Sequence, residues 1–250
     1  LMVLDRREKT VEHRHFYDIL DYVNPGDCLV LNDSRVIPAR MYGLKEGTGA
    51  HIELLLIKRV EGDRWECLVR PGKRLHEGDT VILAGRTDTV PAGTEAPECG
   101  YTLVNGIEQP FKAHILGVHD ADNATRLVEF EYDGIFMERL EEIGSMPLPP
   151  YISRPAEDSD KEMYQTVYSR IEGSVAAPTA GLHFTKELLK KAGEKGVRIA
   201  YVTLHVGIGT FRPVKVDTVE DHKMHFEECS IDEANAEIIN RTIEEGGRII

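Results

Sequence analysis

The feature that most constrains the fold is a helix–strand pair lying between two loops of small residues. Thr185 is suited to cap a helix that starts at Lys186 and runs to about Lys195, and Gly196 is suited to end it. The next segment, Val197–Val202, is rich in β-branched and aromatic residues and predicts a strand. This order is typical of an αβ unit in an open sheet.

The two loops that flank this unit have the composition of a ligand site. Gly173–Thr185 reads G-S-V-A-A-P-T-A-G-L-H-F-T, and Thr203–Pro213 reads T-L-H-V-G-I-G-T-F-R-P. Glycine lets a ligand approach backbone N–H groups, and ligands bind at the carboxyl ends of strands in open sheets. The loops therefore indicate a small-molecule site, although small residues also serve tight turns and close helix–sheet packing.

A second strand end also carries polar residues. Cys28–Leu31 is a continuous apolar run that predicts a buried strand, and it is followed by Asn32, Asp33, Ser34 and Arg35. Polar side chains directly after a buried strand commonly form a site, but Asn-Asp-Ser is also favourable turn chemistry. Both interpretations stay open on the residues alone.

Three further helices are expected in the second half of the chain, the first of them capped by Asp133 and closed by Gly144. Asp160–Arg170 predicts the second, with Tyr164 and Tyr168 on one face. Asp232–Glu245 predicts the third, and the strand that begins after it completes a second αβ unit.

The middle of the chain has a different texture. Between about Leu44 and Asp133, short β-rich runs alternate with turn clusters, which favours a small antiparallel barrel. The segment Gly85–Pro110 predicts a long loop or an extra hairpin. The predicted fold is therefore a larger α/β (α+β) domain, residues 1–43 and 134–250, with a β-barrel domain inserted at residues 44–133. The β-rich runs are His51–Lys58, Arg64–Arg70, Thr80–Leu83, Phe111–Val118 and Arg126–Tyr132.

Charge gives an ambiguous indication about nucleic acid. The net charge of −13 argues against a polyanionic partner, yet Leu29–Arg86 holds slightly more basic than acidic residues. The densest basic cluster is Arg70, Lys73 and Arg74 around a Pro-Gly turn. It suits contact with RNA phosphates, and it equally describes a solvated turn on a mixed-charge surface.

Composition points to a cytoplasmic protein with reduced thiols. The sequence has no run of about 18 apolar residues and no secretory leader. Its four cysteines are scattered without a C-x-x-C pair, so neither a disulfide framework nor a zinc site is indicated.

Three histidines lie in or beside the polar stretches, namely His183, His205 and His225. The pKa of an unperturbed histidine, about 6.5, suits proton transfer near neutral pH. Lone histidines in core loops are more often simply hydrogen-bonded. Metal ligation is the competing idea, but no H-E-x-x-H or similar spacing supports it.

Several of these stretches resemble one enzyme family. Ala176–Thr185 and Leu204–Val214 look like motifs of the S-adenosylmethionine:tRNA ribosyltransferase-isomerase family of queuosine biosynthesis. L-V-L-N-D-S-R-V-I-P-A-R at Leu29–Arg40 is similar as well. Shorter matches of the same kind are Met146–Ile152, Tyr164–Ser169 and Met224–Glu227. The matches span nearly the whole chain in the family's order, and the longer ones are specific.

The resemblance implies a definite reaction. The ribosyl part of S-adenosylmethionine is transferred to the aminomethyl group of 7-aminomethyl-7-deazaguanine at the tRNA wobble position. It is rearranged to an epoxycyclopentane-diol, and adenine and methionine leave. This chemistry needs a base for the proton beside the sulfonium, a donor for departing adenine, and carboxylates near the cation. Residues that fit these demands are His183, His205, His225, Asp33 and Glu227.

The resemblance also implies the binding partners. S-adenosylmethionine is a co-substrate, the macromolecular partner is a tRNA with a GUN-type anticodon, and no metal or membrane is involved. A monomer is expected. The family normally has further segments at both ends, so the resemblance leaves open whether this chain is active by itself. The candidate substrate-binding residues are Asn32, Arg35, Thr179, Gly181, Gly207, Gly209, Thr210 and Arg212, and the candidate tRNA-binding residues, taken from the basic cluster, are Arg70, Lys73 and Arg74.

Two other functional classes compete. A non-catalytic RNA-binding barrel is one, but such barrels usually carry aromatic stacking platforms, and this region has only Trp65, Phe111 and a few others. An S-adenosylmethionine methyltransferase is the other. Release of free adenine separates it from the transferase-isomerase, because methyl transfer leaves the adenosyl group intact.

Overall fold

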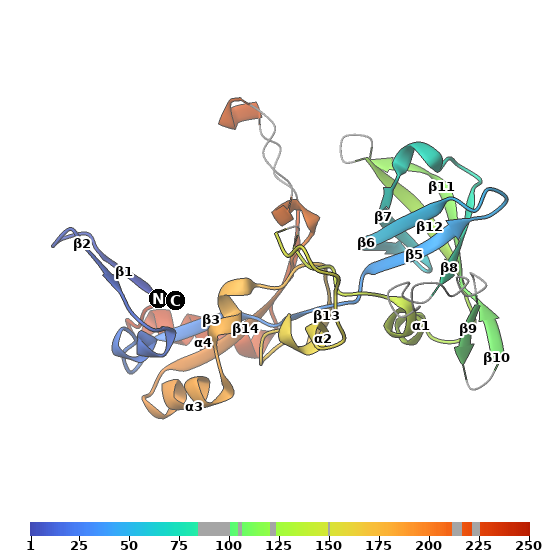
Figure 1. The fold of residues 1–250 in the computed structure, drawn as a ribbon. Coiled ribbons are helices and arrows are strands. Elements are labelled where there is room, and N and C mark those ends of the chain that lie inside the picture. Colours follow the sequence, from blue (N-terminus) through green and yellow to red (C-terminus); the bar gives the residue numbers. More distant parts are fainter. Residues whose placement is uncertain (85–100, 105–106, 121–123, 150, 212–216, 222–225) are drawn as a thin grey trace. The chain divides into compact units, whose positions relative to one another are not determined.

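The computed structural model describes residues 1–84, 101–104, 107–120, 124–149, 151–211, 217–221 and 226–250. The chain forms two compact units (Figure 1). The sheet unit comprises Leu1–Arg35, Tyr164–Val206 and His225–Ile250. The barrel unit comprises Val36–Met163 and Gly207–Met224.

The sheet unit is built on two parallel strands. β3 (Cys28–Asn32) pairs with β14 (Arg198–His205) in a parallel register that matches Cys28 to Arg198 and Asn32 to Val202. On its other edge β14 pairs antiparallel with β15 (Glu228–Ser230). Residues 248–250 run parallel to β3, because the N–H of Val30 donates to the carbonyl of Ile250 at 2.8 Å. The second αβ unit predicted from the sequence is therefore present.

Two capped helices accompany these strands. α3 (Lys186–Glu194) begins after Thr185, whose hydroxyl accepts a hydrogen bond from the N–H of Leu188 at 3.1 Å. α4 (Glu233–Glu244) begins after Asp232, whose carboxylate accepts from the N–H of Asn235 at 2.8 Å. Such caps satisfy N–H groups that the first helical turn leaves without partners. The helix start after Thr185 was predicted from its cap, the start near Asp232 from the predicted helix range Asp232–Glu245, and both are confirmed.

The core of the sheet unit lies between α3 and the strands. Leu188, Leu189 and Ala192 of α3 are buried against Leu29 and Leu31 of β3. Burying a leucine side chain contributes roughly 1.5–3 kcal/mol relative to leaving it exposed, so this packing fixes α3 against the sheet. The alternation of helix and strand in the sequence is thus explained by one shared apolar layer.

Smaller elements complete the sheet unit. β1 and β2 form an antiparallel hairpin, with Met2 opposite His13. A short strand after Asp33, β4, pairs with β13. The bounds are β1 (Met2–Asp5), β2 (Thr10–His13), the 3₁₀ helix η1 (Phe16–Asp21), β4 (Ser34–Val36), β13 (Ile171–Ser174) and the 3₁₀ helix η4 (Thr179–His183).

The barrel unit contains a closed barrel of six antiparallel strands in the order β11-β12-β7-β6-β5-β8. Closure removes the unpaired edges that an open sheet leaves. The predicted α/β fold with a small antiparallel barrel is therefore confirmed. The strands are β5 (Arg40–Lys45), β6 (His51–Glu61), β7 (Arg64–Arg70), β8 (Thr80–Ala84), β11 (Lys112–Asp120) and β12 (Thr125–Glu131).

Five of these strands coincide with the β-rich runs, and β5 was missed. Gly43 interrupts its pattern, since glycine is a poor strand former. A Cβ at Gly43 would lie 2.4 Å from the carbonyl oxygen of Ile82, so the close approach of β8 requires glycine there. The structural unit also begins at Val36 and runs to Met163, whereas the prediction placed the insertion at residues 44–133. The predicted domain boundaries stay a prediction.

One helix prediction is wrong near the end of the barrel unit. α2 (Asp160–Met163) ends at Met163, so the predicted helix Asp160–Arg170 is wrong beyond its first turn. In the Gly85–Pro110 segment, residues 85–100 and 105–106 lie outside the described residues, and β9 and β10 pair antiparallel. The remaining bounds are η2 (Gly72–Arg74), β9 (Tyr101–Val104), β10 (Ile107–Pro110), α1 (Phe136–Ile143), η5 (Ile208–Phe211) and η6 (Val219–Asp221).

Candidate active site

The polar residues of the sheet unit gather where its parallel strands end. β3 ends at Asn32, opposite Val202, and β14 continues for three residues to His205. Parallel strands bring their carboxyl ends to the same edge, where backbone groups run out of strand partners and ligands commonly bind. Side chains then have to complete the hydrogen bonds at this edge.

Asn32 completes the first of them. Its amide nitrogen Nδ2 donates to the carbonyl of Leu204 at 2.9 Å, and its Oδ1 accepts from the N–H of Leu204 at 3.0 Å. The same oxygen accepts from the N–H of Ser34 at 3.1 Å. A side-chain amide thus extends the pairing of β3 with β14 beyond the ladder. The sequence predicted Asn32 as a substrate-binding residue. In the structure its side chain instead bonds to backbone groups of Leu204 and Ser34 and holds the strand ends together.

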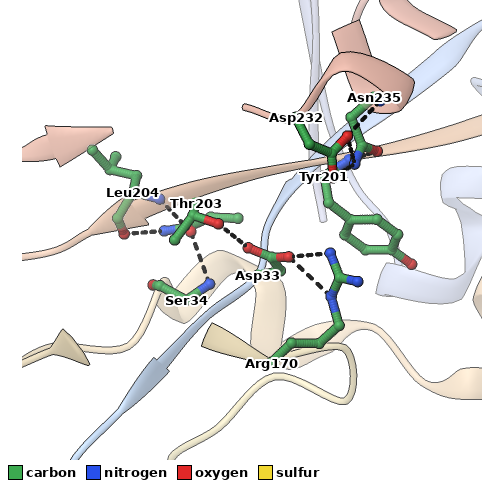
Figure 2. A network of polar contacts seen from close by, with 9 residues as sticks. Asp33, Ser34, Arg170, Tyr201, Thr203, Leu204, Asp232 and Asn235 are labelled. Carbon is green, nitrogen blue, oxygen red and sulfur yellow. Dashed lines mark hydrogen bonds and ion pairs between the residues drawn. The ribbon is translucent and has the colours of Figure 1, made fainter. Parts of the chain in front are cut away.

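Asp33 lies at the centre of the network shown in Figure 2 and is only 1% exposed. Its Oδ1 accepts from the hydroxyl of Thr203 at 2.7 Å, and its Oδ2 accepts from Nε and Nη2 of Arg170 at 3.0 and 2.6 Å. Its carbonyl also accepts from the N–H of Arg170 at 2.7 Å. A buried carboxylate is tolerated when it is paired and hydrogen-bonded in this way.

Arg170 is fixed on two sides. Besides the pair with Asp33, its guanidinium carbon lies 5.2 Å from the centre of the Tyr201 ring. Its side chain is 57% exposed, whereas that of Asp33 is 2% exposed. The hydrogen bonds to Asp33 raise the pKa of Arg170 above its ordinary value, so the guanidinium stays charged. The buried partner therefore holds a cation whose outer part is open to solvent.

A buried serine pair joins β4 to β13 beside this network. The hydroxyls of Ser34 and Ser174 lie 2.7 Å apart, and Ser174 Oγ accepts from the N–H of Val206 at 3.0 Å. Ser34 is 1% exposed and Ser174 is 0% exposed. The end of β14 is therefore tied to a third segment of the chain.

His205, the last residue of β14, has an unsatisfied buried nitrogen. Its Nδ1 has no hydrogen-bond partner among the residues that the structure describes. A Cβ at Gly173 would lie 2.7 Å from Cε1 and 2.8 Å from Nδ1 of the ring, and Gly173 has a φ of +144°. The ring therefore packs on the bare backbone of β13. Buried polar atoms are normally bonded, so this imidazole is the strongest candidate for proton transfer.

Two glutamates, Glu227 and Glu228, lie near His205 in the sheet. β15 pairs Glu228 with His205 in register, and Glu227 precedes that strand as an exposed residue. Glu227 thus lies one residue from the partner of His205. It remains a candidate carboxylate.

His183 lies in a different setting. It is exposed on η4, and its ring stacks on Phe16 with the ring centres 5.1 Å apart. In the same segment Gly181 is required by Tyr168, because a Cβ there would lie 2.2 Å from the Tyr168 hydroxyl. Burial, followed by the influence of Tyr201, raises the pKa of Tyr168 to about 12, so the phenol stays protonated near neutral pH. Thr179 is exposed on η4.

The remaining predicted residues are dispersed. Arg35 donates from Nη1 to the hydroxyl of Ser169 at 3.2 Å within the sheet unit. Gly207, Gly209 and Thr210 belong to the barrel unit. His225 and Arg212 lie outside the described residues.

The basic cluster lies in the barrel unit. Arg70 ends β7, and Lys73 and Arg74 lie in η2; the side chains of all three are exposed. Arg70 is opposite Glu53 in the β6–β7 pairing, whereas Lys73 and Arg74 lie beyond the end of that ladder. The turn therefore presents exposed cations, which suits contact with phosphates.

The comparisons with known proteins give the family. The family model described as "Queuosine biosynthesis protein" matches residues 1–250. The chain belongs to this queuosine biosynthesis family. Among solved structures it is similar to S-adenosylmethionine tRNA ribosyltransferase from Thermotoga maritima, with 30% identity and a TM-score of 0.33. The match covers 100% of this chain and 59% of that one, so the chain spans less than two thirds of that protein's length.

Sequence reasoning missed several residues that the polar network at the ends of β3 and β14 brings together. Arg170, Thr203, Ser174 and Tyr201 were not proposed as site residues. Thr203 and Ser174 stand inside the two polar loops and carried a detectable signal. Arg170 carried none, because its partner Asp33 is 137 positions away and a helix was expected there.

Two absences concern the described residues only. In that part of the chain no group of three or more His, Cys, Asp or Glu side chains is arranged to hold a metal ion. In the same part, no helix is long and apolar enough to cross a membrane.

Proposed function

We propose that the protein modifies tRNA by transferring and isomerising the ribosyl part of S-adenosylmethionine. The acceptor is the aminomethyl group of 7-aminomethyl-7-deazaguanine at the wobble position, and adenine and methionine are released. The observation that carries this proposal is the family match over residues 1–250. The motifs at Ala176–Thr185 and Leu204–Val214, which resemble the transferase-isomerase family, support the choice of co-substrate.

Within this function, the carboxyl edge of the parallel sheet is the proposed reaction site. The reaction needs a base near the carbon beside the sulfonium, whose positive charge acidifies the attached hydrogen. His205 suits this role, because its ring is held against Gly173 and one of its nitrogens is unsatisfied among the described residues. His225 and Glu227 remain candidates for the other proton transfer. His183 is the weakest of the three histidines, since it is exposed and stacked on Phe16.

Asp33, a candidate catalytic residue on sequence grounds, is proposed instead to hold its neighbours in position. Both of its oxygens already accept hydrogen bonds, one from Thr203 and the other from Arg170. A carboxylate so occupied holds its neighbours in place, and a proton transfer would have to break these hydrogen bonds. We assign Asp33 as a positioning residue of the sheet edge.

The basic cluster in the barrel unit is proposed to contact tRNA phosphates. Arg70, Lys73 and Arg74 are exposed, and cations of this kind supply the sequence-independent part of nucleic-acid binding. The whole chain has a net charge of −13, which repels RNA, so RNA binding requires a local basic surface of this kind.

Product analysis tests the function directly. The protein is incubated with S-adenosylmethionine and with tRNA that carries 7-aminomethyl-7-deazaguanine at the wobble position. Free adenine and free methionine are expected together, in equal amounts and in proportion to modified tRNA. A methyltransferase would release S-adenosylhomocysteine, and a binding protein would release nothing. Either of these results would refute the proposal.

A further inference from the structure

The Asp33–Arg170 pair leaves part of a fixed guanidinium without a protein partner. Nε and Nη2 of Arg170 both donate to Oδ2 of Asp33, and the ring of Tyr201 lies against the guanidinium (Figure 2). In the part of the chain that the structure describes, no hydrogen bond is formed by Nη1. A guanidinium held at one edge and stacked on a ring presents its remaining N–H groups with little loss of side-chain freedom.

An oxyanion is the ligand that such donors suit. Arginine in a fixed orientation recognises carboxylates and phosphates through paired N–H groups. Asp33 does not remove this capacity, because it is buried and lies on the Nε side of the guanidinium. The exposed side of Arg170 is therefore an anion-binding position at the same edge of the sheet as Thr203.

The surrounding charges decide which anion is favoured. The carboxylate of Asp232, at the start of α4, is close enough for Arg170 to act on it. The pKa of Asp232 lies below its ordinary value, chiefly because the N–H and side-chain amide of Asn235 hydrogen-bond to it, with Arg170 adding to the effect. Asp232 therefore stays ionised, bonded to Asn235 and within electrostatic reach of the guanidinium.

A cation with an exposed carboxylate within electrostatic reach matches a zwitterion better than a polyanion. An RNA phosphate backbone would gain from Arg170 and be repelled by Asp232. An α-amino acid carries a carboxylate for Arg170 and an ammonium group for the acidic neighbour. The methionine half of S-adenosylmethionine has this pair of charges.

We propose that Arg170 binds the α-carboxylate of S-adenosylmethionine, that Asp33 positions Arg170 for this interaction, and that Asp232 favours the α-ammonium group. The identity of the ligand rests on the proposed function. The interaction anchors the amino-acid half of the co-substrate at the carboxyl edge of β3 and β14, while the ribose carbons react elsewhere in the same molecule.

Binding measurements with two co-substrates test this proposal. Calorimetry compares S-adenosylmethionine with decarboxylated S-adenosylmethionine, which lacks only the carboxylate. The protein is expected to prefer the carboxylated compound by about 10- to 100-fold, the range of a charged hydrogen bond. In Arg170→Gln this preference should disappear, with little change in the affinity for the decarboxylated compound. Arg170→Lys should keep only part of it, because lysine lacks the paired donors.

Two further variants control for position and for folding. Arg198→Gln removes another ion-paired arginine, one that lies at the opposite end of β14 and pairs with Glu245. It should leave the preference unchanged. Asp33→Asn should reduce the preference in the same direction as Arg170→Gln, since it releases the guanidinium; a purely structural Asp33 would alter thermal stability and leave the ratio of affinities intact.

The outcomes separate the inference from the proposed function. If Arg170→Gln keeps the preference for the carboxylate while the parent protein releases adenine and methionine, only the inference is wrong. If Arg170→Gln instead weakens tRNA binding and lowers its salt dependence, Arg170 binds phosphate and the inference is also wrong. If the parent protein binds neither compound and releases no adenine, both the inference and the proposed function fail.

Discussion

The barrel and the sheet edge solve the same backbone problem in different ways. In the barrel every strand has two neighbours, and its least exposed side chains are apolar, among them Met41, Leu54 and Leu83. At the sheet edge the ladder of β3 and β14 stops, and buried polar side chains such as Asp33 and Ser174 take over the hydrogen bonds. The closed barrel therefore buries mainly apolar side chains, with Thr125 of β12 a buried polar exception, whereas the end of the parallel strands collects several buried polar side chains that can take part in chemistry.

The largest expected effect is on turnover and belongs to the sheet edge. His205→Gln keeps much of the size and polarity of the side chain but removes a base near pH 7. Loss of a general acid or base typically costs about 10²–10⁴-fold in rate, or about 3–5 kcal/mol of barrier. Adenine release by the folded variant measures it.

The matched control is His51→Gln, an exposed histidine at the start of β6 in the barrel unit. It should retain the parent rate. A His205→Gln protein that folds and keeps a rate within a few-fold of the parent would make His205 part of the scaffold, and proton transfer would pass to His225 and Glu227.

The next effect is on stability and belongs to the barrel. Leu54 is 0% exposed on β6, and Leu54→Ala should lower the free energy of unfolding by about 2–5 kcal/mol through reduced burial and a cavity. Denaturant unfolding gives this value. Because the change leaves the sheet edge intact, adenine release per folded molecule should stay at the parent level. If Leu54→Ala kept the parent stability but lost adenine release, the barrel core would take part in catalysis and the contrast with the sheet edge would be wrong.

A smaller effect on stability is expected at Asp27, which is buried in the sheet unit like Asp33 but lies at the other end of β3. Asp27 precedes β3, and its carboxylate accepts from Nε of Arg248 at 3.1 Å and from the N–H of Asn24 at 2.6 Å. These hydrogen bonds, above all those from Arg248, hold the pKa of Asp27 well below its ordinary value. Asp27 lies at the amino end of β3, away from the polar edge, so its role is structural.

The sign of the pH effect follows from the lowered pKa. The stabilisation by Asp27 is complete above the unfolded pKa, about 4, and is lost as the pH falls towards the lower folded pKa. Asp27→Asn should lower the free energy of unfolding at pH 7 by about 1–3 kcal/mol. It should also make the stability of the protein fall less between about pH 5 and pH 2. Unfolding curves at several pH values check this, and identical pH profiles for parent and variant would contradict it.

The smallest effect concerns tRNA binding by the barrel unit. Replacing Arg70, Lys73 and Arg74 together with alanine should weaken tRNA binding modestly. It should also reduce the slope of log affinity against log salt by about one unit for each phosphate that these cations neutralise in the parent protein. Affinity for S-adenosylmethionine alone should not change. An unaltered salt slope would remove the cluster from the RNA interface.

Local signals in the sequence predicted much of the fold and part of the site. Thr185 and Asp232 cap their helices through hydrogen bonds that span three residues, so both helix starts were readable. The strand end at Asn32 and Asp33 was recognised because polar residues directly follow an apolar run. These features depend on neighbours in the chain and can be inferred without the fold.

The rest depends on interactions between distant segments. The expected helix beyond Met163 does not form, since the N–H groups of Arg170 and Ile171 donate to the carbonyl of Asp33 and draw this segment towards β4. Helix propensity yields to these tertiary hydrogen bonds. The same hydrogen bonds place the Arg170 guanidinium on Asp33, a partnership that no local pattern shows.

Hydrogen exchange with S-adenosylmethionine alone tests the central claim most directly. The account predicts slower exchange at residues 31–35, 169–175 and 201–206, where the sheet edge binds the co-substrate, and unchanged exchange in β5, β6, β7 and β8 of the barrel. Arg170→Gln should reduce the protection at a fixed concentration of ligand. Protection confined to the barrel strands, with none at the sheet edge, would contradict the assignment of the reaction site.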